Sequence, residues 1–455
     1  MSHFQYLDPQ TKEQKSIKTS KIGRYRWRIV ALLFFATTIN YIDRNVLSFI
    51  VTNVDFKLQM LGLPAGTTLT AEHERAFNEL YANVQSLFKL AYGLGFILMG
   101  WLIDKLGTRI GYAISIGIWA ISAISHSLVT GIRGLTAARF GLGIGESGNF
   151  PSAIKTVAEW FPKRERSFAT GIFNAGANIG IISTAFAVPY LLESVGWQNT
   201  FLITSTLGFI LLICWVFIYR RPEEHKKLSA AEFAYIRSDE DAQQAVQERV
   251  SWRRLFPYRQ TWAFAVGKFM TDCIWWFYLT WLPKFFNENA AFQLDLKTIG
   301  PAFFIIYLVS DGGSVVFGWL ATNLIKRGWE VNKARKFTLL ICALCVVPIF
   351  FAAITKSVVI AIGLIALAAA AHQGWSANLF STVADMFPRS AVGSVVGIGG
   401  LFGALGGALL DKASGTLINE LGYWSLFAIA SMAYLIALAL IHLLAPKLKQ
   451  VTFSK

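Results

Sequence analysis

Hydrophobic residues in this chain gather in long continuous runs that are separated by short polar segments. Most runs have about 20 residues, the length that an α-helix needs to cross the hydrocarbon core of a bilayer. Strands of a membrane barrel are shorter and alternate apolar with polar residues, and these runs do neither. The pattern predicts an all-α membrane protein with twelve transmembrane helices, near 29–54, 81–103, 110–130, 132–158, 167–191, 198–219, 261–286, 298–325, 337–355, 358–384, 392–418 and 422–445.

Lysine and arginine are frequent in every second loop between these spans. They follow spans 2, 4, 8, 10 and 12, whereas the loops around Glu193, Lys356 and Glu420 contain few of them. Residues 1–28 are also polar and basic and run directly into the first span, so we expect a cytoplasmic tail rather than a signal peptide. Because basic loops stay in the cytoplasm, the pattern predicts a multi-pass protein of the cell (inner) membrane with both termini inside.

Two polar segments are longer than the others. Residues 55–80 carry mixed charge and are expected to form an external loop, for which we predict no function. Residues 220–260 are expected inside, where the stretch from Leu228 to Arg249 is predicted to form a polar helix on the membrane surface. The predicted organisation is a tail (1–28), an N-terminal six-helix bundle (29–219), a linker (220–260), a C-terminal six-helix bundle (261–445) and a second tail (446–455).

A short repeat relates the two predicted bundles. The sequence Glu-Trp-Phe-Pro-Lys at 159–163 recurs as Asp-Met-Phe-Pro-Arg at 385–389. Transporters are often built from two repeated bundles that move about a central site. In the register of this repeat, Glu146 of span 4 falls opposite His372 of span 10. The repeat therefore favours two six-helix halves with polar residues deep in equivalent spans.

The composition agrees with a membrane protein and argues against other classes. Charged residues make up 15% of the chain, whereas a soluble domain has about 25%. The net charge of +15 lies in loops without interleaved exposed aromatics, so we expect no nucleic-acid partner. Cys342 and Cys345 lie in an apolar run without histidine or acid beside them, which favours packing over metal binding. No nucleophile–base set appears in an aqueous segment, so we expect neither an enzyme nor a bound cofactor or metal.

The first span contains an acid next to an arginine, in the stretch Asn-Tyr-Ile-Asp-Arg-Asn at 40–45. Each such charge costs about 2.5–3.5 kcal/mol at the centre of a bilayer. Adjacent residues point about 100° apart on a helix, so Asp43 and Arg44 cannot simply neutralise each other, and at least one must face another span. In span 4, Arg139 and Glu146 are seven residues apart and share a helix face. We therefore expect Arg139 and Glu146 to be the counter-charges.

Two explanations of these four residues are open. They could be structural ion pairs that hold helices together, or they could form a transport site, because intramembrane ionisable residues usually mark a pathway. Burial favours the neutral form of a carboxylic acid, so Asp43 and Glu146 are candidates for proton exchange near neutral pH. A proton on one acid would free Arg44 or Arg139 to hold an anion. These residues would supply the proton site and the anion site that a proton-coupled anion symporter needs, with the proton as coupling ion.

Other polar side chains in the spans are less decisive. Tyrosines can either pack or bond to substrate hydroxyls, and asparagines four residues apart share one helix face. Lys89 either extends to the membrane interface or is functional. Lys268 and Asp272 form an ordinary helix pair that could gate, and no role is predicted for Asp311 and Asp411. The candidate substrate contacts are Tyr41, Tyr92, Asn174, Asn178, His372, Gln373 and Ser376.

The turn after span 2 has a distinctive pattern of glycines and charges, from Gly100 to Arg109. Asp104 can cap a neighbouring helix, while Lys105 and Arg109 can meet the negative C-terminal ends of helices. Together with Gly107, these residues are interpreted as a conformational latch rather than a substrate site.

This turn resembles the signature of the major facilitator superfamily, and the resemblance covers essentially the whole chain. The stretch 40–45 together with Arg139 to Glu146 is similar to the anion:cation symporter family. The segments 371–373 and 385–400 resemble the hexuronate transporters of that family. The resemblance implies a twelve-helix transporter that works by alternating access on a proton-coupled sugar acid.

The same resemblance implies roles for single residues. Asp43 and Glu146 fall on proton sites, and Arg44 falls on the arginine that engages the substrate carboxylate. A relative has glutamine where this chain has Asn178, a departure that shortens the side chain, and the 55–80 segment is also atypical. Further binding positions of the family fall on Arg139, Tyr41 and Tyr92.

Three functions fit these patterns. The leading hypothesis is symport of protons with a sugar-acid anion, above all a hexuronate such as glucuronate or galacturonate, by a protein that we expect to be monomeric. The alternative is uptake or exchange of another organic anion, such as an aldonate, glucarate, another carboxylate or a phosphate ester. Exchange needs only the cationic site and leaves the two acids unexplained. A nutrient sensor on the same fold would be expected to carry an added soluble domain, and the predicted tail after residue 445 is short.

Overall fold

The computed structural model describes residues 23–238, 252–289, 291–292, 294 and 298–451, and all regular secondary structure in these ranges is helical. The N-terminal half contains α2 (Tyr25–Ile50), α3 (Val54–Leu61), α4 (Ala71–Ser125), η1 (His126–Leu128), α5 (Ile132–Glu146), α6 (Asn149–Trp160) and α7 (Lys163–Ile218). A linker follows with η2 (Pro222–Glu224), α8 (Ala230–Ile236) and α9 (Trp252–Leu255). The C-terminal half contains α10 (Arg259–Glu288), α11 (Ile299–Lys326), α12 (Val331–Val346), η3 (Val347–Ala353), α13 (Val358–Met386), α14 (Arg389–Leu421) and α15 (Trp424–Leu444).

Glycines divide the longest helices into lengths that fit a membrane. Helix α4 has 55 residues, and a straight helix of that length would measure about 80 Å, far more than the ~30 Å hydrocarbon core. It turns at Gly107, whose φ of 78° lies in the left-handed region that glycine adopts without strain. Helix α7 turns in the same way at Gly196, where φ is 79°. Each of these two helices therefore supplies two of the predicted spans.

Seven stretches of the described chain are long and apolar enough to cross a membrane, and the bent α4 and α7 are two of them. The predicted spans 1, 4 and 7 correspond to α2, to α5 with α6, and to α10. These three are interrupted by polar residues, among them the stretch 40–45 in α2. Counting α4 and α7 twice and joining η3 to α12, the described helices follow the order of the twelve predicted spans.

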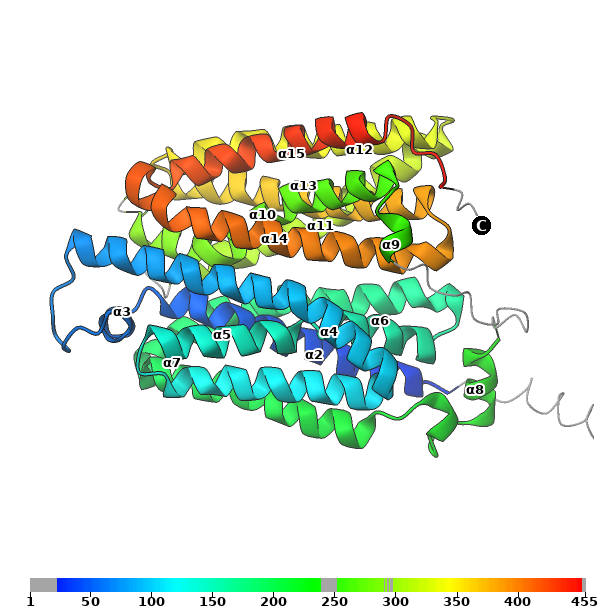
Figure 1. Cartoon of the computed structure of the whole chain (residues 1–455), viewed down its shortest axis with the longest axis horizontal. Coiled ribbons are helices and arrows are strands. Elements are labelled where there is room, and N and C mark those ends of the chain that lie inside the picture. Colours follow the sequence, from blue (N-terminus) through cyan, green and yellow to red (C-terminus); the bar gives the residue numbers. More distant parts are fainter. Residues whose placement is uncertain (1–22, 239–251, 290, 293, 295–297, 452–455) are drawn as a thin grey trace, which may run out of the picture.

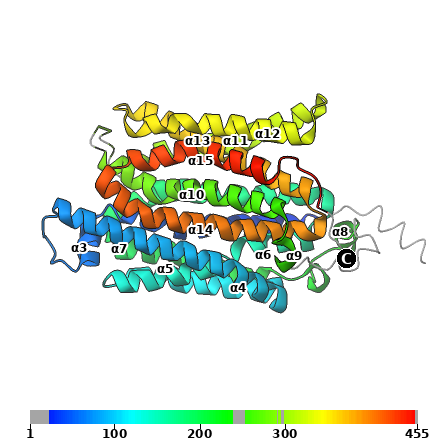
Figure 2. The same cartoon turned by 45° about the horizontal axis from the view of Figure 1, so that its top comes forward.

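The two halves lie side by side with their helices roughly along one direction (Figures 1 and 2). In Figure 1, α2 and α4 to α7 form the lower bundle and α10 to α15 the upper one, and α14 packs against α4 where the bundles meet. Helix α3 lies at one end of the molecule and α8 at the other, so we name these the α3 end and the α8 end. The described chain starts and finishes at the α8 end. A central site can thus be built from both halves.

The segment 55–80 is largely helical, so the prediction that it forms a loop was wrong. Helix α3 begins after Asn53, whose Oδ1 accepts from the backbone N–H of Phe56 at 2.9 Å. Helix α4 already begins at Ala71, where the hydroxyl of Thr70 caps it. Hydropathy marks only the membrane-embedded part of a helix, so polar first turns and short polar helices escape it.

Part of the helix predicted in the linker is observed. Of the polar helix expected from Leu228 to Arg249, α8 is observed, and residues 239–251 lie outside the described part. The hydroxyl of Ser229 caps α8 by accepting from the N–H of Glu232 at 3.2 Å. This helix contacts the first span through Glu232 instead of lying free on a surface.

Glu232 caps the first span from the linker. Its buried carboxylate accepts from the backbone N–H groups of Tyr25 and Arg26, each at 3.1 Å, and from the guanidinium of Arg26 at 3.2 Å. Such an acid satisfies free N–H groups and complements the helix dipole. Because removing one partner of a buried pair costs about 3 kcal/mol, we expect Glu232→Ala to lower the apparent unfolding temperature of the purified protein. The exposed Glu224 gives the matched control Glu224→Ala, and equal unfolding temperatures for both variants would contradict this role.

Candidate functional site

Arg44 of α2 and Glu146 of α5 form an ion pair between two helices of the N-terminal half. Arg44 Nε lies 2.7 Å from Glu146 Oε2, and the two side chains are 5% and 0% exposed. Arg44 Nη2 also donates to Asn40 Oδ1 at 3.2 Å, one helical turn away. Glu146 Oε1 has no hydrogen-bond partner among the described residues. The pair is therefore desolvated, but its hydrogen-bonding capacity is not exhausted.

Three aromatic rings surround the guanidinium of Arg44. Its Cζ lies 4.7 Å from the ring centre of Tyr41, 4.8 Å from that of Tyr92 and 5.2 Å from that of Trp276. Such cation–π contacts gain strength where water is excluded. Trp276 belongs to α10, so the C-terminal half completes a cage that the N-terminal half begins. The sequence reasoning missed Trp276, although its place one turn after Asp272 in span 7 was a usable signal.

Arg139 does not pair with an acid, contrary to the expectation from the shared helix face. Its Nη1 and Nη2 both donate to the backbone carbonyl of Arg44 at 3.2 Å. The side chain is fully buried, and its Cζ lies 5.2 Å from the ring of Phe88. Glu146 is the counter-charge of Arg44 alone, while Arg139 fixes the backbone of α2 at the centre of the site.

The carboxylate of Asp43 has no hydrogen-bond partner on either oxygen among the described residues, although the residue is 4% exposed. Glu146, Arg139 and Trp119 are its polar neighbours. Trp119 Nε1 and Arg139 Nε also lack partners within the described chain. Buried polar groups are nearly always hydrogen-bonded. A cluster of such exceptions at one place marks a candidate functional site.

Close helix packing places Glu146 in this site. A Cβ on Gly143 would lie 2.5 Å from the carbonyl oxygen of Phe88, and one on Gly145 would lie 2.4 Å from the backbone nitrogen of Trp119. Both neighbours belong to α4, so only glycine permits this approach of α5. The glycine-rich sequence of span 4 thus brings its acid up to α2 and α4.

The predicted contacts in α13 lie in the C-terminal half. His372 is 4% exposed, its Nδ1 lies 2.6 Å from the hydroxyl of Tyr434, and its ring stacks on Trp275 with centroids 4.8 Å apart. Gln373 and Ser376 are half-buried. His372 is thus engaged within its own half.

The two predicted asparagines of α7 differ in their surroundings. Asn178 is buried and donates to Asp311 of α11, so it joins the two halves. Asn174, one turn nearer the α8 end, is exposed. The structure therefore separates two residues that their spacing had grouped, and it gives Asp311 a partner that the sequence could not suggest.

The turn from Gly100 to Arg109 lies at the α8 end. Asp104 pairs with Lys155 of α6 at 3.1 Å, and Lys105 Nζ lies 4.9 Å from the ring centre of Trp101. Arg109 Nη2 donates to the carbonyl of Val216 in the last turn of α7 at 3.3 Å. Gly107 provides the left-handed bend, whereas a Cβ on Gly100 would meet open space. These contacts join helices within the N-terminal half.

Two further charge pairs lie in the spans. Lys89 is 1% exposed and pairs with Asp411 of α14, so it does not extend to the membrane interface. Lys268 and Asp272 lie 2.7 Å apart as the predicted i, i+4 pair of α10. Asp411, which had no predicted role, thus receives a partner from the other half.

These features define a class: a helical multi-pass membrane transporter in which a charged, desolvated centre lies where two bundles meet. The chain belongs to the major facilitator superfamily, whose family model matches residues 33–410. The predicted family and fold are thereby confirmed, and so is the prediction that the protein is a transporter and not an enzyme.

The chain resembles particular transporters over nearly its whole length. It is 28% identical over 416 residues to the hexuronate transporter of Escherichia coli (strain K12), with 90% of this chain and 92% of the relative covered. It is 27% identical over 446 residues to the D-galactonate transporter of Escherichia coli O6:H1, with coverages of 94% and 96%. The crystal structure of a D-xylose–proton symporter matches with a TM-score of 0.68 at 14% identity, covering 92% of this chain and 97% of the symporter, which shows the shared fold.

Proposed function

We propose that this protein takes up a sugar-acid anion together with protons, and that the anion is a hexuronate such as glucuronate or galacturonate. The observation that carries the proposal is the buried Arg44, which is held by Glu146 while the neighbouring Asp43 has no partner among the described residues. An arginine in an aromatic cage suits a carboxylate on a sugar. The named relatives, a hexuronate and a galactonate transporter, support this class of anion.

Glu146 occupies the place that a substrate carboxylate would need. Arginine binds carboxylates best through two parallel hydrogen bonds, but Arg44 donates Nε to Glu146 and Nη2 to Asn40. A proton on Glu146 would remove its charge and weaken its hold on Arg44. Proton binding and anion binding would then favour each other, which is the reciprocal coupling that symport requires.

Asp43 is our second proposed proton carrier. An ionised carboxylate without a hydrogen-bond partner is strongly unfavourable in a desolvated place. We infer that Asp43 is protonated in the described state. Because Asp43 adjoins Arg44 in α2, a shift of this helix on loss of the proton would also move the anion-binding arginine.

The polar and aromatic side chains around Arg44 would recognise the sugar. Tyr41 and Tyr92 present hydroxyls beside the guanidinium, and Trp276 offers a flat face for a sugar ring. Arg139 would contact α2 rather than substrate. The further proposed contacts are Asn174 and Asn178 of α7 and His372, Gln373 and Ser376 of α13.

We infer that the α8 end is cytoplasmic. The basic turn with Lys105 and Arg109 lies there, and so do both ends of the described chain. Basic segments stay inside during membrane insertion. The α3 end then faces outward from the cell (inner) membrane, and we expect the protein to act as a monomer.

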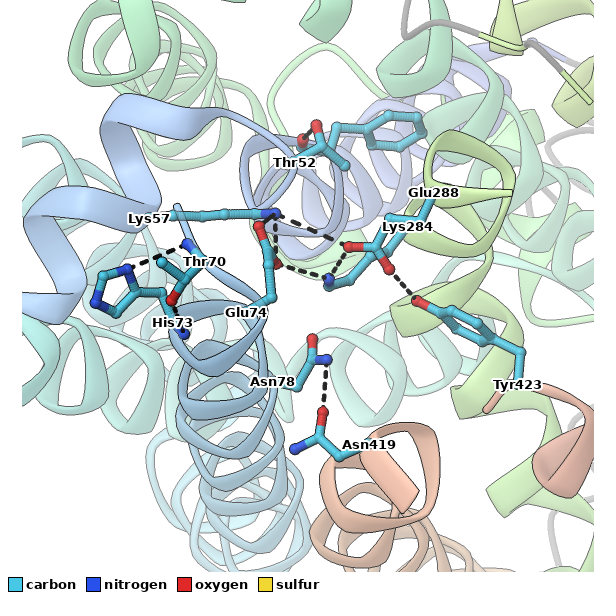
Figure 3. A network of polar contacts seen from close by, with 11 residues as sticks. Thr52, Lys57, Thr70, His73, Glu74, Asn78, Lys284, Glu288, Asn419 and Tyr423 are labelled. Atoms are coloured by element: carbon cyan, nitrogen blue, oxygen red, sulfur yellow. Dashed lines mark hydrogen bonds and ion pairs between the residues drawn. The ribbon is translucent and has the colours of Figure 1, made fainter. Parts of the chain in front are cut away.

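At the proposed outer end, polar side chains join the two halves (Figure 3). Lys284 of α10 lies 3.7 Å from Glu74 of α4, and Asn78 of α4 donates to Asn419 of α14 at 2.9 Å. On the other side of the centre, Asn174 is exposed. We infer that the described state is closed to the outside, so the contacts in Figure 3 have to break when the transporter opens outward.

Purified protein in liposomes tests this function. A panel of sugar acids is first screened for thermal stabilisation, and the stabilising compounds are then followed as radiolabelled substrates under an imposed pH gradient. We expect glucuronate or galacturonate to accumulate and the accumulation to collapse when a protonophore is added. Exchange without any effect of pH would favour an anion exchanger instead, and a lack of uptake for every sugar acid would refute the proposal.

A further inference from the structure

The ion pair of Lys89 and Asp411 joins the two halves inside the protein. Both side chains are 1% exposed, and Lys89 comes from α4 while Asp411 comes from α14. The C-terminal half also contributes Thr280, whose Oγ1 lies 3.3 Å from Lys89 Nζ, and Trp281, whose Nε1 donates to Asp411 at 3.2 Å. The Lys89–Asp411 pair is thus part of a polar network that links α4 to α10 and α14.

Lys89 is next to the proposed anion site on its outer side. It precedes Tyr92 by three residues on α4, toward the α3 end. Lys89 Nζ lies 5.1 Å from the ring of Trp276, and Arg44 Cζ lies 5.2 Å from the same ring. A Cβ on Gly407 would lie 2.7 Å from Trp276 and 3.1 Å from Lys89, so a glycine lets α14 close over this place. One indole therefore contacts two cations.

The two cations differ in where their counter-charges lie. Arg44 is neutralised by Glu146 of the same half, whereas Lys89 is neutralised by Asp411 of the opposite half. When the halves separate on the outer side, Arg44 keeps its acid and Lys89 loses its own. An ammonium that faces the opened outer side without its acid would attract an anion that enters from outside.

We propose that Lys89 is a second cation of the transport site, which Asp411 holds while the outer side is closed and which the substrate anion engages when the outer side is open. On closure, Asp411 takes the place of the anion at Lys89, and the anion passes to Arg44, which contacts the same Trp276 ring. This role rests on the proposed uptake of an organic anion. In a purely structural pair, the two charges could be exchanged between α4 and α14 without effect on transport. In the proposed role, the substrate anion needs the positive charge on α4.

The first measurement follows outer opening without any substrate. Ala82 is 1% exposed, and its Cβ would lie 2.9 Å from a Cβ on Gly415 of α14, so a cysteine at position 82 is covered when the outer side is closed. In a chain whose four native cysteines are replaced by alanine, Ala82→Cys is treated in intact cells with a membrane-impermeant maleimide. We expect Asp411→Asn to speed labelling about tenfold, because a buried charge pair is lost. The charge swap Lys89→Asp with Asp411→Lys should return labelling to the parent rate.

The second measurement follows external half-saturation for D-glucuronate, by initial uptake into cells that lack other transporters for it. We expect Lys89→Gln to raise the half-saturation concentration about tenfold or more, and Lys89→Arg to stay close to the parent. The charge swap should remain as poor as Lys89→Gln, because α4 then presents an acid to the anion. Lys412→Gln is the matched control, since Lys412 also crosses from α14 to α4 but is exposed, and it should change neither measurement.

The swap decides between the two explanations. If it restores both the labelling rate and the half-saturation, Lys89 and Asp411 are only a structural pair and the proposal is wrong. Unchanged labelling in Asp411→Asn would likewise overturn the role in outer closure. If the parent protein transports no sugar acid, the proposed function is refuted instead. The labelling measurement uses no substrate, so its result does not depend on that outcome.

Discussion

Asp43→Asn and Glu146→Gln are each expected to lower accumulation of a sugar acid under a pH gradient about tenfold while preserving the fold. Each change removes one titratable group and keeps its size. One pH unit supplies about 1.4 kcal/mol per coupled proton, which corresponds to about tenfold accumulation. Proteoliposomes with a gradient of one unit should therefore lose about tenfold in the ratio of internal to external substrate for each proton that is no longer coupled.

The two variants should differ in how they bind the anion. Glu146→Gln leaves Arg44 without its acid, so we expect tight anion binding that no longer weakens as the pH rises. Asp43→Asn mimics the protonated acid permanently and keeps the Arg44–Glu146 pair, so its anion binding should retain the pH dependence. Calorimetric titration with glucuronate at several pH values would reveal this difference.

Asp55→Asn is the matched control for these carboxylates. Asp55 is exposed in the first turn of α3, away from the central site. Its variant should accumulate substrate as the parent does. If Asp43→Asn and Glu146→Gln also accumulate substrate fully, the assignment of the proton carriers is wrong.

Arg44→Lys is expected to weaken binding of the sugar acid about a hundredfold even though the positive charge remains. Lysine lacks the planar fork that binds a carboxylate with two hydrogen bonds, and it fits stacked aromatic sites less well. In the structure, Arg44 uses its fork on two acceptors, with Nε on Glu146 and Nη2 on Asn40, and three rings lie within 5.2 Å of its Cζ. The loss combines a charge-assisted hydrogen bond of about 1.5–3 kcal/mol with part of the cation–π energy.

The dissociation constant of glucuronate and the unfolding temperature are measured on the same samples. Arg28→Lys is the control, because Arg28 is exposed at the start of α2 and lies 5.5 Å from the ring of Tyr25. It should bind like the parent. Arg44→Lys that binds glucuronate normally would show that the anion is held elsewhere, whereas a fall in unfolding temperature alone would indicate a structural role for the Arg44–Glu146 pair.

Trp276 of the C-terminal half is also expected to contribute to anion affinity, because its ring contacts the guanidinium of Arg44. Trp276→Phe keeps a ring over Arg44 and is expected to cost less than tenfold in affinity, while Trp276→Ala should lose about tenfold or more, in line with a desolvated cation–π contact. Both are read from the same titration. Equal affinities for the alanine variant and the parent would exclude the indole from the site.

The sequence alone determined the membrane class, the order of the spans and the family. Apolar runs of membrane length leave helices as the simplest solution, since backbone groups in lipid must be satisfied within the segment. The charges of span 1 and span 4 stood out for the same reason, because lipid makes every such residue costly. Where polar residues continue a helix beyond the membrane, as in the first turns of α4, the same hydropathy signal failed.

The tertiary structure decided which of these residues meet. Helical spacing fixes the helix face on which Arg139 and Glu146 lie, but it does not identify the residues of other helices that they contact. Close approach at Gly143 and Gly145 places Glu146 on Arg44, and Arg139 is left to the backbone of α2. Such contacts depend on the rotation and distance of helices far apart in the chain, and no local pattern encodes them.

The dependence on long-range helix packing also explains why the sequence could not identify the partner residues in the C-terminal half. Trp276, Asp411 and Asp311 are ordinary members of their own helices until α10, α14 and α11 pack against the N-terminal half. Their partners lie more than a hundred residues away in sequence. The polar stretch 40–45 thus pointed from sequence to a candidate site, and the packing of the helices determined which residues its charges meet.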